Sequence, residues 1–146
     1  IATFNKKQHE IITKQVKHTA ETMGLADWSI TVSLEMLDED SGNTAEAHIT
    51  NDSSVAEIWL CHGWPDKTPD DALWTVVHEL MHLHTHRMSD HVDKLIYDRF
   101  SPSETRLAWS FWTSAHETTV DNIARHWSGM MDPGDGYRLL GQTPPA

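Results

Sequence analysis

Two histidines spaced four residues apart offer the clearest chemistry in this sequence. They are His78 and His82, in the segment 77–82 that reads VHELMH. Positions i and i+4 share a face of a helix, so both imidazoles point at one position, as two ligands of a zinc ion must. Glu79 lies between them and reaches a metal-activated water without binding the metal itself. The spacing predicts a Zn²⁺ site with Glu79 as general base.

A tetrahedral zinc ion needs a third protein ligand besides its water. The long histidine motif of the metzincins would place glycine at position 85 and histidine at position 88, but Thr85 and Met88 stand there, which excludes that class. Glu117 is the better candidate, because it follows His82 by 35 residues on the next strongly capped segment.

Asp121 lies four residues beyond Glu117 and shares its helix face. It would accept the free N–H of a ligating histidine, an arrangement that zinc sites commonly have. Two alternatives remain open at this stage. The acid pair could be the solvated face of a helix, or the third ligand could come from the histidines that follow the motif, namely His84, His86 and His91.

Three helices are expected among the elements that position these residues. Residues 5–23 are amphipathic and end before Gly24. The motif helix starts at Thr68 with a capping hydroxyl, Pro69 and acidic residues, and we expect it to reach about Arg87, with a loop or a short helix over 88–100. A capping box at 101–104 predicts a helix to Ser128, stopped by Gly129.

Strands are expected between the first and second helices. The alternation of apolar and polar residues predicts them at Trp28–Met36, Thr44–Ile49 and Val55–His62, with a turn over Asp38–Asn43. Residues 130–146 are rich in glycine and proline and are expected to be irregular. The order of elements predicts an α+β domain: an N-terminal helix, a small three-stranded sheet, the motif helix and a C-terminal helix that carries Glu117.

Composition narrows the function classes. The chain has 146 residues, which fits one domain over 1–146, and a formal charge of −11, which argues against nucleic-acid and anionic-membrane partners and favours cationic ones. Eleven histidines and a single cysteine point to a metal rather than to disulfides. With no visible signal or membrane span, a cytoplasmic protein is expected, and a monomer is the default.

The two motifs together resemble those of gluzincin-type zinc metallopeptidases of minimal size, the minigluzincins and the zincin-like domains of phages and prophages. That family pairs an HExxH helix with a glutamate helix bearing ExxxD, which match residues 78–82 and 117–121 here. The resemblance implies a zincin-like fold, a zinc site of His78, His82 and Glu117, and Asp121 behind a histidine. It also implies a sheet whose edge strand borders the cleft, for which Val55–Cys61 is the candidate, and a bacterial-host or phage context.

A peptidase also needs a group that stabilises the oxyanion formed when water attacks a carbonyl. The candidates are Tyr137 and His116, followed by Tyr97, and Trp59 on the candidate edge strand is expected to line the cleft. The sequence thus favours a zinc-dependent hydrolase that cleaves peptide or protein substrates. Two other functions remain open: a non-catalytic zincin-fold binding module, and a hydrolase of non-peptide amides.

Overall fold

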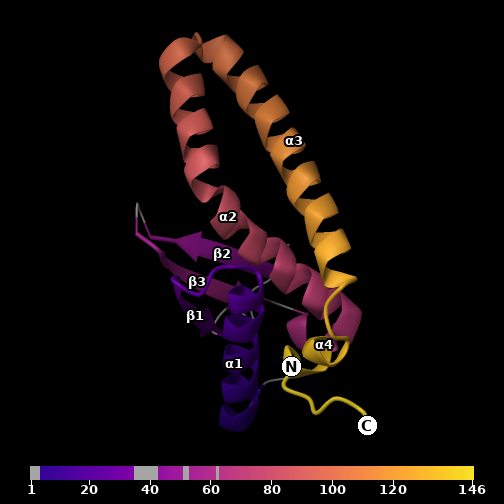
Figure 1. Cartoon of the computed structure of the whole chain (residues 1–146). Helices are drawn as coiled ribbons and strands as arrows, with labels where there is room; N and C mark the ends of the chain where they lie inside the picture. Colours follow the sequence, from indigo (N-terminus) through magenta and orange to yellow (C-terminus); the bar gives the residue numbers. More distant parts are fainter. Residues whose placement is uncertain (1–3, 35–42, 51–52, 62) are drawn as a thin grey trace.

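The computed structural model describes residues 4–34, 43–50, 53–61 and 63–146, and it has the α+β architecture that the sequence predicts (Figure 1). The elements run in the order α1 Lys6–Thr22, β1 Ser29–Ser33, β2 Ala45–Ile49, β3 Val55–Leu60, α2 Pro69–Arg99, α3 Pro102–Ser128 and α4 Gly134–Arg138. Helices α2 and α3 form a long hairpin beside a small sheet. Helix α4 and the C-terminal segment lie at the end of the molecule away from the turn of this hairpin.

Helix α1 forms where its pattern predicts and supplies one wall of the core. Asn5 caps it: its side chain accepts from the Gln8 N–H, while the Gln8 side chain accepts from the Asn5 N–H. The chain leaves the helix through Gly24, whose φ of +81° favours glycine. The apolar face expected from the sequence is fully buried, at Ile12, Val16, Ala20 and Met23.

The sheet has the strand order β1-β3-β2, with β1 parallel and β2 antiparallel to β3. Alternate residues of β1 and β3 are buried against the helices, as the period of two predicts. Strand β1 is shorter than the expected Trp28–Met36, and β3 ends before the expected His62. Residues 35, 36 and 62 lie outside the described residues, as does all but Asn43 of the expected turn at 38–43.

The prediction of the edge strand is wrong. Val55–Cys61 was the candidate, but β3 is the central strand and is paired on both sides. The edge strand beside α2 is β2, which contacts that helix and, among the described strands, pairs on one side only. Alternation of side chains gives a strand's faces and not its place in the sheet, because strand order is decided by tertiary packing.

Helix α2 is longer than expected. It begins as predicted, with the Thr68 hydroxyl accepting from the Asp71 N–H and Pro69 in the first turn, but it continues through 88–100 to Arg99. The loop or short helix expected there is therefore wrong. No glycine or proline interrupts residues 70–101, so nothing in the backbone ends the helix before Pro102 forces Ser101 into an extended conformation.

Helix α3 starts and ends where the sequence predicts, with the capping box of Ser101 and Glu104 in place. The prediction that residues 130–146 are irregular is partly wrong, because residues 134–138 form helix α4. Gly136 makes that helix possible: a Cβ there would lie 2.1 Å from the Pro69 carbonyl oxygen, so only glycine lets α4 pack this closely on the start of α2. The Trp64 indole N–H also donates to the Leu139 carbonyl at 3.0 Å.

One hydrophobic core joins α1, the inner face of the sheet, the first half of α2, the end of α3 and the segment around α4. The buried face of α2 contains the residues expected from its pattern, among them Val76, Val77 and Leu80, each fully inaccessible. Among the described residues, no helix combines the length and the apolar character that crossing a membrane requires.

Candidate metal centre

The middle of α2 presents His78 and His82 on one face, as the four-residue spacing predicts. Their Nε2 atoms lie 3.3 Å apart, and both side chains are mostly buried. The residues between and beside them on the core face fix the helix against the sheet and α1. Both imidazoles are thus held on a rigid element.

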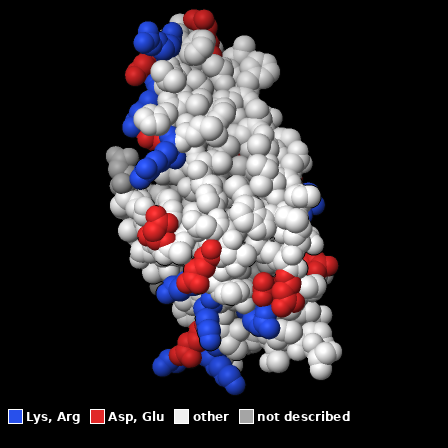
Figure 2. All heavy atoms as spheres, in the orientation of Figure 1, with Lys and Arg blue, Asp and Glu red and all other residues white. Residues whose placement is uncertain are grey.

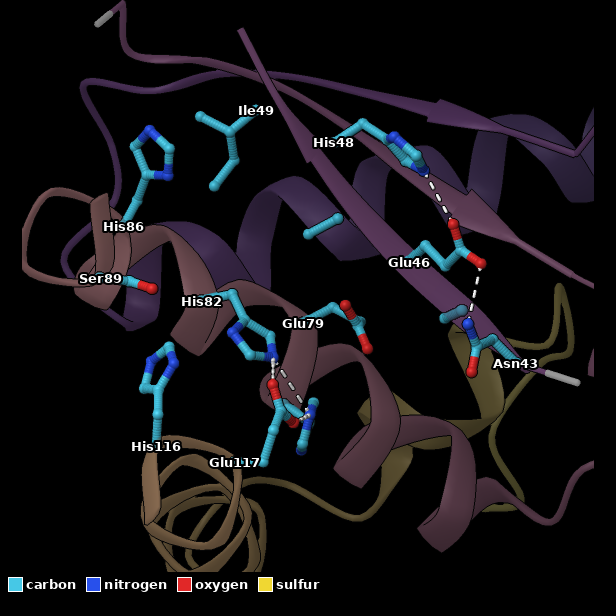
Figure 3. A pocket seen from close by; sticks show the side chains of 13 residues that line it. Asn43, Glu46, His48, Ile49, Glu79, His82, His86, Ser89, His116 and Glu117 are labelled. Carbon is cyan, nitrogen blue, oxygen red and sulfur yellow. Dashed lines mark hydrogen bonds and ion pairs between the residues drawn. The ribbon is translucent and has the colours of Figure 1, made fainter. Parts of the chain in front are cut away.

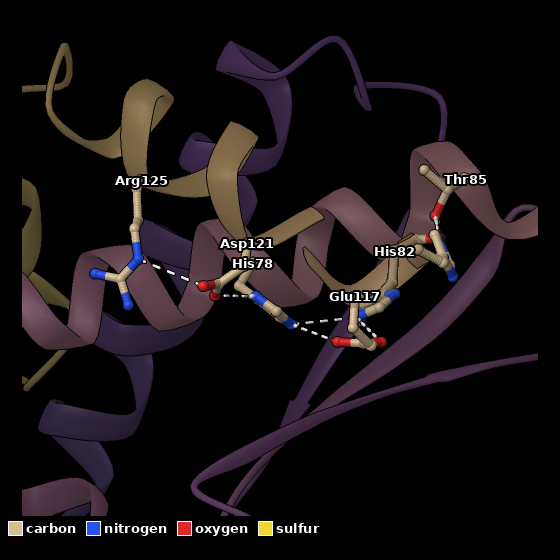
Figure 4. Close-up of polar contacts among 7 residues, drawn as sticks. His78, His82, Thr85, Glu117, Asp121 and Arg125 are labelled. Carbon is tan, nitrogen blue, oxygen red and sulfur yellow. Dashed lines mark hydrogen bonds and ion pairs between the residues drawn. The ribbon is translucent and has the colours of Figure 1, made fainter. Parts of the chain in front are cut away.

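Helix α3 crosses this face of α2 and brings Glu117 to both histidines. Its carboxylate oxygens lie 3.4 Å from His78 Nε2 and 3.3 Å from His82 Nε2. One ligand atom from each of the three side chains can be chosen so that all lie within 4.8 Å of one another. Among the described residues, a search for clustered histidine, cysteine and acidic side chains that could hold a metal ion finds these three. The donor set expected from the sequence is therefore assembled (Figures 3 and 4).

A chain of contacts lies behind His78. Asp121 Oδ1 is 3.3 Å from His78 Nδ1, and Asp121 Oδ2 is 3.4 Å from Arg125 Nε (Figure 4). His78 Nδ1 is itself buried, and the approach of Asp121 does not meet hydrogen-bond geometry, so a small rotation of either side chain is needed to complete the bond. The Arg125 guanidinium lies 4.6 Å from the ring centre of Trp74, whose indole meets His78 edge-on.

Asp121 therefore stands where a partner that orients His78 must stand. If its carboxylate accepts a hydrogen bond from Nδ1–H, Nε2 of His78 keeps its lone pair toward Glu117 and the shared position. Trp74 and Arg125 are contributors that the sequence analysis missed. The available signal was helical spacing, since each lies one turn along its helix, Trp74 before His78 and Arg125 after Asp121.

Glu79 points away from the ligand group toward β2, where it accepts a hydrogen bond from the Ala47 backbone N–H. Burial raises the pKa of its carboxyl to about 8; the Ala47 bond opposes that shift, and the nearby Glu117 and Glu46 carboxylates add to it. In the metal-free protein Glu79 is thus mostly protonated near neutral pH. The positive charge of a bound metal would act in the opposite direction.

Burial lowers the pKa of His82, with the histidines at 78 and 116 acting in the same sense and Glu117 against it. The neutral imidazole is therefore the favoured form of His82, and it is also the form that binds a metal. His116 is a neighbour of this site: its ring meets that of His82 edge-on at 5.5 Å, and its Nε2 lies 2.8 Å from the Thr85 hydroxyl. Trp112 stacks on its other side.

The candidate metal-binding group lies in an open cavity of about 530 Å³ between β2, α2 and α3 (Figure 3). His86, Ser89 and Ile49 form one end of the cavity, and Asn43 and Glu46 form the other. The free edge of β2 is one wall. The Thr50 N–H donates to the Val55 carbonyl, and the Cys61 N–H donates to the Thr44 carbonyl. Because every second residue of an antiparallel strand is hydrogen-bonded to its neighbour, the backbone N–H and C=O groups of residues 45, 47 and 49 point away from β3 and toward this cavity.

Several expected site residues lie elsewhere. Tyr137 is on α4, beside the start of α2, and does not line the cavity; neither does Tyr97, which is exposed on the last turns of α2. Trp59 is on the central strand and stacks on His48 at 3.7 Å, while its indole N–H donates to Glu57. It too does not line the cavity, because alternation turns its side chain to the outer face of the sheet.

The histidines that follow the motif do not replace Glu117 in the observed group. His84 turns away and donates from Nε2 to the Met23 carbonyl at 2.6 Å. His91 is exposed, and His86 only lines the cavity. Among the described residues, the three that come together are the two motif histidines and Glu117.

Comparison of the chain with protein-family models, with curated proteins and with solved structures finds no match.

Proposed function

We propose that the protein is a zinc-dependent hydrolase, and specifically a metallopeptidase. The observation that carries the proposal is the spacing of the donor atoms. Ligand atoms about 2.0–2.1 Å from a tetrahedral zinc ion lie about 3.3–3.4 Å from one another. The Nε2 atoms of His78 and His82 lie 3.3 Å apart, and they lie 3.4 and 3.3 Å from the two different carboxylate oxygens of Glu117, so the carboxylate faces the position between the histidines. Two imidazoles and one carboxylate are also a donor set of catalytic zinc sites, which leave a fourth position open.

Zinc held by these residues would supply Lewis-acid polarisation of a substrate carbonyl and would lower the pKa of a water to near neutrality. Glu79 is placed to serve as general base, because it lies between the two histidines in sequence, lines the same cavity and does not belong to the ligand group. Its carboxylate takes the proton of the attacking water and returns it to the leaving amine. Asp121 keeps His78 in the tautomer that the site needs.

The free edge of β2 supports a peptide as substrate. Backbone N–H and C=O groups of residues 45, 47 and 49 face the cavity, and an extended peptide can pair with such an edge. The Ala47 backbone interacts with Glu79, so this edge lies beside the proposed general base. A substrate strand would therefore cross the metal centre with its scissile bond beside the general base.

Charge in the cavity favours substrates with a basic side chain near one end. Hydrogen bonding from Asn43 lowers the pKa of Glu46, with His48 adding to that shift, so Glu46 is ionised at neutral pH. The whole chain has a net charge of −11, which also attracts cationic partners. His116 is the residue that we propose for stabilising the oxyanion, because its ring adjoins that of His82 in the cavity.

The test compares wild type with Glu79→Gln and, as a matched control, Glu10→Gln on the exposed face of α1. Each is loaded with zinc and assayed on a peptide library that contains basic residues. We expect wild type and Glu10→Gln to cleave, and Glu79→Gln to keep its zinc while losing at least about 100-fold in rate, the lower range for a general base. Full activity of Glu79→Gln would refute the mechanism.

The same assay separates the remaining functions. Zinc binding without cleavage of any peptide or simple amide would indicate a binding module. Cleavage of non-peptide amides alone would keep the role of Glu79 and change the substrate class.

A further inference from the structure

The α2–α3 hairpin extends well beyond the candidate metal centre, and among the described elements none packs on its outer end (Figure 1). Exposed large apolar side chains are concentrated there. Seven of the ten recorded among the described residues lie between positions 88 and 111, namely Met88, Leu95, Tyr97, Phe100, Leu107, Trp109 and Phe111. Leu107 is 61% exposed and Phe111 is 70% exposed. Monomeric proteins rarely leave such side chains together in water.

Four of these side chains lie on one face of the hairpin. The seam between the helices is marked by partly or fully buried residues, which include Ser89 and Ile96 on α2 and Ala108 and Trp112 on α3. Met88 and Leu95 each come directly before a seam residue of α2, and Leu107 and Phe111 each come directly before a seam residue of α3. In antiparallel helices, positions with the same offset from the seam lie on the same side. These four residues are called the apolar stripe below.

The apolar stripe faces away from the cavity. Thr85 belongs to the seam, since its hydroxyl meets His116 of α3. His86, which lines the cavity, directly follows Thr85, whereas the residues of the apolar stripe directly precede seam positions. The cavity and the stripe are therefore on opposite sides of the hairpin, and a partner on the stripe would leave the cavity open.

Charge decides what can cover the stripe. Residues 87–113 contain four basic and four acidic side chains, so this segment is neutral, while the whole chain carries −11. The remaining 7 basic and 18 acidic residues hold all of the net charge. Figure 2 shows a broad area over the two helices with neither acidic nor basic side chains, and charged groups along its margin and at the lower end. The hairpin is thus the surface on which two copies of this acidic protein can meet without strong repulsion.

From this stripe and this charge distribution we infer that the chain forms a symmetric dimer, in which the apolar stripes of two hairpins pack together as a four-helix bundle. A two-fold axis brings the same surface of both copies together, and helix pairs with unpartnered apolar faces are buried in this way in bundles. Met88, Leu95, Leu107 and Phe111 form the centre of the interface. The inference does not depend on the metal centre.

The test measures molar mass by light scattering after size exclusion, from 1 to about 200 µM protein. Wild type is expected to shift from 16.6 kDa toward twice that mass as its concentration rises. Phe111→Glu is expected to stay at the monomer mass. Met130→Glu is the matched control, since Met130 is 69% exposed but lies outside the hairpin, and it is expected to dimerise like wild type. Circular dichroism of both variants checks that they are folded.

Salt gives an independent readout. Because the acidic remainder of each chain repels its copy, raising the salt concentration is expected to strengthen the dimer. A wild-type chain that stays monomeric at all of these concentrations would overturn the inference, as would equal dimerisation of Phe111→Glu and Met130→Glu. Monomeric wild type that binds phosphatidylcholine vesicles would also overturn it, because the stripe would then serve a lipid surface.

Discussion

The two halves of the α2–α3 hairpin differ in what supports them. The half next to the sheet has α1, β2 and α4 packed against α2, and it holds the candidate metal-binding residues and the buried core. In the far half, among the elements that the structure describes, the two helices pack only on each other, and most of the large apolar side chains are exposed. One pair of helices thus combines a rigid platform for chemistry with a surface that lacks a partner. Rigidity of a site comes from the layers behind it and not from the helix that carries it.

The largest expected difference between the two halves comes from the same substitution, leucine to alanine, at two positions of α2. Leu80 is fully buried in the supported half of α2, and Leu95 is 57% exposed in the far half. We expect Leu80→Ala to lower the free energy of unfolding by about 2–5 kcal/mol, and Leu95→Ala by less than about 0.5 kcal/mol. Urea unfolding of dilute protein measures both. Similar losses would show that the far half is as well packed as the core.

The pH dependence of stability tests the buried carboxyl of the supported half. The pKa of Glu79 is raised from 4.5 to about 8, so the folded state keeps a proton that the unfolded state loses. This contribution is fully present below pH 4.5 and is lost as the pH rises through 8, at a rate of at most about 1.4 kcal/mol per pH unit. Metal-free wild type should therefore lose stability from pH 5 to 8 relative to Glu79→Gln. Parallel curves for the two proteins would refute the buried, protonated carboxyl.

Asp121 tests whether the contacts behind His78 matter to the metal. Asp121→Asn removes the charge beside His78 Nδ1 and is expected to weaken zinc binding about 10–100-fold, as is usual for such partners. Asp98→Asn, at the far end of α2, is the control and should bind zinc like wild type. Competition with a chromophoric chelator measures both affinities. Equal affinities would mean that Asp121 serves only its ion pair with Arg125.

The smallest expected effect concerns the turn of the hairpin. The Ser101 hydroxyl caps α3, and Ser101→Ala should cost about 1 kcal/mol. The loss should be local: amide exchange should accelerate around the turn, while zinc affinity stays unchanged. Hydrogen exchange read by mass spectrometry resolves the two regions. Faster exchange near His78 would show that the halves unfold together.

The parts of the fold that the sequence predicts are those with local causes. Capping residues such as Thr68 and Ser101 satisfy the first N–H groups of a helix within four residues, so both helix starts are predicted to the residue. The extent of α2 was missed because, beyond Leu83, only Ile96 of the helix is buried, and only the absence of glycine and proline before Pro102 marks its last turns. Helix α4 was missed because Gly136 allows close packing on Pro69, a contact that the sequence does not show.

The candidate site also has residues whose positions follow from local spacing and residues whose positions depend on tertiary packing. His78 and His82 share a face by helix geometry alone, and the meeting with Glu117 depends on how α3 crosses α2, which the motif spacing anticipated. The place of Trp59 could not be obtained, because the order of strands in a sheet is set by long-range pairing. The same holds for the oxyanion candidates: His116, and not Tyr137, lines the cavity that contains the candidate metal-binding residues.

Zinc content per chain tests the central claim most directly. Wild type, Glu117→Ala and the exposed control Glu10→Ala should be purified without a histidine tag, supplied with zinc, desalted and measured by elemental mass spectrometry. The account predicts close to one zinc per chain in wild type and in Glu10→Ala, and a clear loss in Glu117→Ala. Zinc retained at the wild-type level in Glu117→Ala, or no zinc in wild type, would contradict it.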